Sequence, residues 1–112
     1  MKTASLTNNI SYKEDKPNVS VLFKTKTTKE IRILMKKGQI MEEHKAPQPI
    51  VIEIFEGAID FGVNGEQLLL KKGDLITLEA HVLHDLTCVA DAIVRLSISN
   101  LDDEERVKNV AS

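Results

Sequence analysis

The fold is decided by the stretch Gly73-Asp74-Leu75-Ile76-Thr77-Leu78-Glu79-Ala80-His81-Val82-Leu83-His84-Asp85-Leu86. Its Gly-Asp pair favours a turn, and the apolar run that follows favours a strand. A short loop then leads to His84, which is expected to open the next strand. A second glycine turn stands upstream, in Gly38-Gln39-Ile40-Met41-Glu42-Glu43-His44. Each of the two turns is therefore expected to deliver a histidine onto a strand.

Alternation of apolar and polar residues continues on both sides of this stretch, which is typical of β-strands. Strands are predicted over Val19–Phe23, Glu30–Met35, Ile50–Phe55, a hairpin within Phe61–Leu70 centred on Asn64-Gly65, and Ile93–Ile98. Turns or bends are predicted at Lys36–Gln39, Glu56-Gly57 and Lys71–Asp74. Short strands separated by glycine turns predict an all-β domain with a closed or sandwiched antiparallel sheet.

The chain of 112 residues is long enough for one domain with a single core. We predict an N-terminal arm or edge strand over residues 1–18 and the β-domain over residues 19–99. Residues 100–112 are predicted to be a C-terminal tail, either a short helix or disordered.

Composition and charge exclude several classes of function. The net charge is −2 and the lysines are interleaved with acidic residues, so no nucleic-acid partner is expected. No apolar run approaches the length of a membrane span, and the first twenty residues are polar, unlike a signal peptide. Cys88 is the one cysteine, which fits a reducing compartment. We therefore expect a cytoplasmic protein without a membrane partner.

The upstream turn resembles the first sequence motif of the cupin superfamily. That motif places a glycine, two histidines, a glutamate and a second glycine at fixed spacings. Gly38, His44 and Gly57 fall in register with it. Ala46 stands at the position of the second histidine, and Ile50 stands at that of the glutamate.

The downstream turn resembles the second cupin motif. Gly73 and His84 match it, whereas Glu79 and His81 stand where proline and glycine are usual. The similarity extends over about residues 30 to 99, which is most of the chain. It implies a small single-domain cupin of the conserved-barrel type, with the double-stranded β-helix, or jelly-roll, fold.

The resemblance also implies a place for one divalent metal, such as Fe, Mn, Ni or Zn. Metal-binding cupins hold the ion with three imidazoles and one carboxylate, and leave positions open for substrate. His44 and His84 would supply two nitrogens, but Ala46 and Ile50 supply no ligand.

Other donors near these histidines are candidates for a rebuilt site. Strand alternation puts Glu42 on the same face as His44 if that strand is unbroken. Gln48 is an oxygen donor in the following loop, and His81 lies three residues before His84. A metal site of His44 and His84, with Glu42 or His81, is therefore one hypothesis. Hydrogen bonding of the two histidines to each other, to water or to a ligand is another.

Three functions stay open on these residues. The favoured interpretation is binding of a small molecule in the barrel interior, and the alternatives are a metal-dependent dioxygenase or isomerase and a structural module with a vestigial pocket. The residues leave undecided whether the chain is an enzyme. The candidate pocket residues are His44, His84, Glu42, Gln48, Ala46 and Ile50.

Small cupins resemble one another in being homodimers, so a homodimer is expected. Its interface would join sheet edges and apolar side chains of the outer face, for which Val51 and Phe55 are the candidates.

Overall fold

The computed structural model describes residues 1–99, so the predicted C-terminal tail lies outside the described residues. The described part contains seven strands and no helix, which confirms the all-β prediction. None of its segments is a helix long and apolar enough to cross a membrane. The strands are β1 (Asn18–Lys24), β2 (Thr28–Met35), β3 (Ile40–His44), β4 (Ile50–Val63), β5 (Glu66–Lys71), β6 (Leu75–Leu78) and β7 (His84–Ser99).

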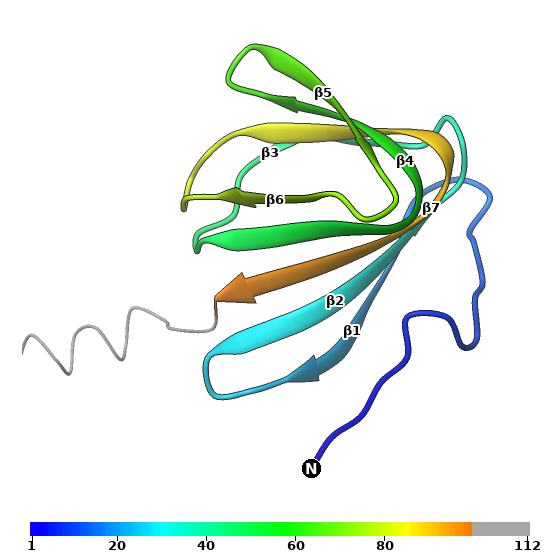
Figure 1. The fold of residues 1–112 in the computed structure, drawn as a ribbon, viewed down its shortest axis with the longest axis vertical. Helices are drawn as coiled ribbons and strands as arrows, with labels where there is room; N and C mark the ends of the chain where they lie inside the picture. The colour runs from blue at the N-terminus through cyan, green and yellow to red at the C-terminus, as the bar shows by residue number, and fades with distance from the viewer. Residues whose placement is uncertain (100–112) are drawn as a thin grey trace, which may run out of the picture.

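Two long strands, β4 and β7, run through the whole barrel and pair with each other in antiparallel fashion (Figure 1). At one end β7 pairs with β2 and β4 pairs with β6, while β1 extends the sheet beyond β2. At the other end β7 pairs with β3 and β4 pairs with β5. The sheet thus curls into two walls that share their central strands.

The predicted turns join these strands as expected. Asn64 and Gly65 connect β4 to β5 with φ angles of 52° and 77°, as a two-residue type I′ hairpin requires. Gly38 and Gly73 also have positive φ, in the turns that precede β3 and β6. The two glycine turns therefore deliver His44 to the end of β3 and His84 to the start of β7.

The predicted bend at Glu56-Gly57 does not end a strand; it lies inside β4. Pairing between β4 and β7 shifts register three times between Ile54 and Ile59. Gly57 has a φ of 83°, and a Cβ there would lie 2.3 Å from the backbone oxygen of Asp91. Only glycine fits this bulge, which lets one continuous strand serve both walls of the barrel.

Strand β2 shows how the sequence separates the core from the outer face. Ile31, Ile33 and Met35 point into the core with exposures of 8% or less, as predicted. The alternate residues Arg32 and Leu34 face outward, yet they too are buried. The core cluster is completed from the other strands by Ile50, Ile52, Ile54, Ile59, Phe61, Val63, Leu70, Leu78, Leu86, Cys88, Ala92 and Val94.

Among the outward-facing residues of β2, Arg32 is buried where the N-terminal arm, residues 1–17, reaches it. The arm contains no strand and passes beside β1 and β2 (Figure 1). Arg32 donates hydrogen bonds to backbone oxygens of the arm. One chain segment therefore covers part of the outer wall from outside the barrel.

Candidate functional site

The structure brings His44 and His84 together at one end of the barrel. His44 ends β3, His84 begins β7, and the two residues lie directly opposite each other in the ladder between these strands. Their ring centroids are 4.3 Å apart and the ring planes are tilted by 56°. His84 is buried at 3% exposure, whereas His44 is exposed. The His44 ring is therefore accessible to solvent, and the His84 ring is buried.

A bulge in β3 sets the direction of His44. Met41 pairs with Leu86 and His44 pairs with His84, so Glu42 and Glu43 together oppose a single residue of β7. The strand is not unbroken, and the alternation argument that put the Glu42 side chain beside His44 fails for that reason. The side chain of Glu42 is exposed. The backbone oxygen of Glu42, rather than its side chain, contacts His44.

Backbone oxygens fix the tautomer of both imidazoles. His44 Nδ1 lies 2.8 Å from the oxygen of Glu42, and His84 Nδ1 lies 2.9 Å from the oxygen of Val82. A carbonyl oxygen only accepts, so each Nδ1 carries the hydrogen. In the neutral rings both Nε2 atoms then keep a lone pair. The site consequently offers two acceptor nitrogens from neighbouring strands.

The surroundings of His84 favour the neutral form of its ring. Burial lowers the pKa of His84 below the usual 6.5, and the neighbouring His44 lowers it further. The oxygen of Val82 and the carboxylate of Asp85 act in the opposite direction without reversing the shift. Phe61 stacks on the His84 ring, with centroids 5.6 Å apart and an angle of 12°.

Phe61 and Asp85 are site residues that the sequence reasoning missed. Phe61 has the strand parity of Ile59 and Val63, which predicts burial but not stacking on a histidine of another strand. A Cβ on Gly62 would lie 2.7 Å from the carboxylate oxygens of Asp85, so the missing side chain makes room for this acid. Only the pairing of β4 with β7 reveals either contact.

The other predicted pocket residues differ in exposure. Ile50 is a core residue at 3% exposure, and Ala46 packs against the core. Gln48 is partly buried in the loop between β3 and β4. His81 is exposed with a φ of 68°, and its N–H donates to the oxygen of Ala46 at 2.8 Å. This bond ties together the two loops that lead into β4 and β7.

The donor set does not fit a catalytic metal centre of the implied kind. Within residues 1–99, no three His, Cys, Asp or Glu side chains are grouped so that they could hold a metal ion. Catalytic sites for zinc and for non-haem iron take three protein ligands. The structure offers two imidazoles, and alkyl groups stand at the other two positions of the motif, Ala46 and Ile50.

The fold is shared with solved cupin structures. A RmlC-like cupin protein from Desulfovibrio desulfuricans matches with a TM-score of 0.81 and 19% identity, over 88% of this chain and 96% of its own. KdgF from Halomonas matches with a TM-score of 0.76 and 16% identity, over 93% and 98%. A conserved Klebsiella pneumoniae protein with a double-stranded β-helix domain matches with a TM-score of 0.76 and 18% identity, over 88% and 89%.

These likenesses confirm the predicted fold, a small cupin barrel of the double-stranded β-helix type. No family model matches the sequence, and no curated protein sequence matches it. Sequence identities this low support a shared fold, but they do not indicate an activity for this chain.

Proposed function

We propose that this cupin-fold chain binds a small molecule at the His44–His84 pair, through hydrogen bonds that the molecule donates to the two Nε2 atoms. The observation that carries the proposal is the fixed tautomer of both rings, each anchored through Nδ1 to a backbone oxygen. Two adjacent acceptors suit a ligand with neighbouring hydroxyl or N–H groups, such as a polyol or an amide. The stacked Phe61 ring supports the pair from the barrel interior.

The ring signals of the three histidines test this proposal by NMR. Sugars, polyols, hydroxy acids and amides would be screened for shifts of His44 and His84, with the exposed His81 as the internal reference. A true ligand also raises the free energy of unfolding, by about 2.7 kcal/mol at a hundredfold excess over its Kd. His44→Gln and His84→Gln should abolish this gain, and His81→Gln should preserve it. A stabilisation that survives both site substitutions would place the ligand elsewhere.

A metal-dependent enzyme is the second candidate. The same anchoring favours it, because histidines that ligate metals usually donate their other ring N–H to a carbonyl or carboxylate. Metal content would be measured on chelator-free protein after incubation with Fe(II), Mn(II), Ni(II) or Zn(II). Near one equivalent, lost in either site variant, favours a metal held with donors from outside the pair. A trace amount of metal would favour small-molecule binding instead.

The proposal also includes a second copy of the chain as a partner. Val51 on β4 is 40% exposed and Leu75 on β6 is 62% exposed. Leu75 pairs with Glu53, which shares the strand parity of Val51, so both apolar side chains project from the same outer wall. Phe55 has this parity too but is already partly buried. An apolar outer wall of this kind supports a homodimer interface.

A further inference from the structure

The N-terminal arm is attached to the barrel chiefly through one side chain, that of Arg32 on β2. Nη1 of Arg32 donates to the oxygen of Asn8 at 2.7 Å, and Nη2 donates to that of Asn9 at 3.3 Å. Longer contacts of 3.4 and 3.5 Å reach the oxygens of Ser5 and Leu6. Ser5 Oγ accepts from the N–H of Asn8, which fixes a turn that aims these oxygens at the guanidinium.

Among the described residues, the charge of Arg32 has no carboxylate partner. Arg32 is 9% exposed, and no ion pair within residues 1–99 includes it. Its Nε is buried without a hydrogen-bond partner. Burying a guanidinium under neutral carbonyl groups costs hydration that these groups restore only in part. When the arm lifts, water replaces the carbonyl oxygens around the guanidinium, so the hydrogen bonds from Arg32 stabilise closure by less than they would in a dry site, yet they remain the main attachment.

No backbone–backbone hydrogen bond described for residues 1–99 joins the arm to the barrel. The arm is held by side chains instead. Lys2 Nζ donates to the oxygen of Lys24, and Asn18 Nδ2 donates to that of Ser11. A segment attached in this way can open without disrupting any strand pairing.

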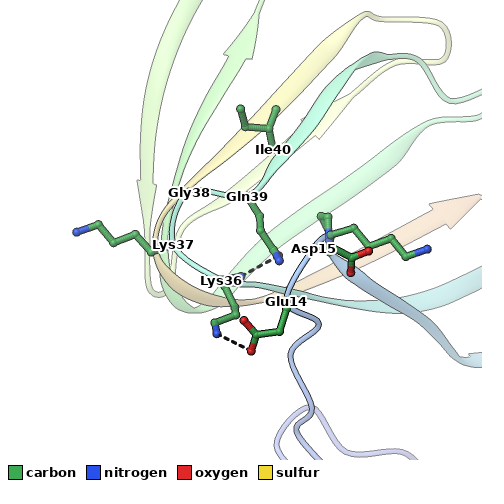
Figure 2. A pocket seen from close by; sticks show the side chains of 9 residues that line it. Glu14, Asp15, Lys36, Lys37, Gly38, Gln39 and Ile40 are labelled. Atoms are coloured by element: carbon green, nitrogen blue, oxygen red, sulfur yellow. Dashed lines mark hydrogen bonds and ion pairs between the residues drawn. The ribbon is translucent and has the colours of Figure 1, made fainter.

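The second firm attachment joins the arm to the turn between β2 and β3. Gln39 Oε1 accepts from the N–H of Lys36 at 3.0 Å, and Gln39 Nε2 donates to the oxygen of Lys13 at 2.7 Å. Lys36 Nζ also pairs with Glu14 at 3.2 Å. An open hollow of about 590 Å³ lies between the arm and the turn. Figure 2 shows Glu14, Lys36 and Gln39 close together among its lining residues. Gln39 therefore fastens the arm to the turn.

This turn leads straight into the strand that carries His44. Strand β3 begins at Ile40, directly after Gln39, and pairs with β7 on one side only. The oxygen of Gln39 accepts from the N–H of Cys88 at 2.9 Å, and the N–H of Gly38 donates to the oxygen of Cys88 at 2.8 Å. The turn is thus joined to β7 and, through a strand of five residues, to His44.

We propose that residues 1–17 are a strap that closes over Arg32 and, through Gln39, holds the β2–β3 turn so that His44 stays against His84. The importance of this coupling rests on the function proposed for the histidine pair. The strap itself needs no ligand. Opening of the strap would uncover Arg32 and would loosen β3, which links the outer wall of the barrel to the candidate site.

The test uses the full chain with Arg32→Gln and, as the matched control, Arg95→Gln. Arg95 lies directly opposite Arg32 in the ladder, but its side chain binds Glu30 and Glu53, and no hydrogen bond described for residues 1–99 joins it to the arm. Trypsin cleavage after the arm residue Lys13 should become at least tenfold faster in Arg32→Gln. It should stay near the wild-type rate in Arg95→Gln.

Tyr12 is the chain's one tyrosine, and it reports on the strap independently. Burial raises the pKa of Tyr12 above 10.0, the acids Asp91 and Glu56 add to the rise, and Arg32 opposes it. Arg32→Gln should therefore lower the pKa of Tyr12 if the strap opens, because burial is lost. It should raise that pKa if the strap stays closed, because only the opposing charge is lost. Phenolate absorbance during a pH titration separates the two signs, and a rise overturns the proposal.

Coupling to the site is read from the ring signals of His44 in the absence of ligand. They should shift in Arg32→Gln and also in Gln39→Glu, which keeps the acceptor for Lys36 but loses the donor to Lys13. His81 should stay unchanged in both variants. Unchanged His44 signals in an opened strap would contradict the coupling. Because no ligand is used, failure of the small-molecule screen does not affect this result.

Discussion

At the scale of single residues, the lowered pKa of His84 makes the free energy of unfolding depend on pH. The pKa of His84 is lowered in the folded state, so below the usual 6.5 the unfolded chain takes up a proton that the folded chain refuses. The contribution of neutral His84 to the free energy of unfolding is complete above pH 6.5. It decreases as the pH falls below 6.5, and it is fully lost once the pH is below the lowered pKa of the folded state.

We therefore expect the urea midpoint of the wild type to fall as the pH drops below 6.5. His84→Gln should flatten this dependence, and His81→Gln should retain it, because His81 is an exposed loop residue. An identical pH dependence in His84→Gln and the wild type would show that another group is responsible. Glu30 is not that group in this range, since its effect lies below 4.5.

Glu30 is the buried carboxylate of the outer wall. Burial alone would raise the pKa of Glu30, but hydrogen bonds from Ser97, Thr28 and Arg95 outweigh it, so the pKa is lowered. Ser97 Oγ donates to Glu30 Oε2 at 2.6 Å. Ser97→Ala should cost about 1.5 to 3 kcal/mol at neutral pH, the usual range for a hydrogen bond to a charged group. A double-mutant cycle with Glu30→Ala, which removes the acceptor, measures this interaction, and a coupling energy near zero would contradict the expected value.

At the scale of elements, the bulge at Gly57 lets β4 serve both walls. Gly57→Ala adds a Cβ 2.3 Å from one backbone oxygen and 2.6 Å from another, at a positive φ. We expect a loss of about 3 kcal/mol in the free energy of unfolding. Gly38→Ala is the matched control, because its φ is also positive but nothing lies within 4 Å of the new Cβ. It should cost only about 1 to 2 kcal/mol. Equal losses would mean that the close approach is relieved by a small shift of β7.

The elements also show what a sequence of this kind can predict. Glycine turns, the Asn64-Gly65 hairpin and the alternation in β2 are local signals, and the structure confirms them. No local signal predicts the bulge in β3, because the Glu42-Glu43 pair contains no glycine or other residue that marks a break in a strand. The stacking of Phe61 on His84 depends on pairing between distant strands. For that reason the position of the two histidines was predictable, whereas their neighbours were not.

At the scale of the whole molecule, the outer wall has two differently covered parts. The arm covers the part around Arg32, while the part around Val51 and Leu75 is exposed. Between them lies the polar network in which Arg95 joins Glu30 and Glu53. In an isologous dimer each copy offers the same surface, so a self-complementary interface would centre on the exposed apolar part.

The expected homodimer is tested by sedimentation velocity of the full chain at micromolar concentration. Val51→Lys places a charge in the apolar part of the wall and should give monomers, because a buried unpaired charge is costly. Val89→Lys is the control, since Val89 is 43% exposed against 40% for Val51 but lies outside the pairing with β6. It should leave the dimer intact. A monomeric wild type would make the homodimer wrong, and a dimer that survives Val51→Lys but not Val89→Lys would move the interface to the opposite wall.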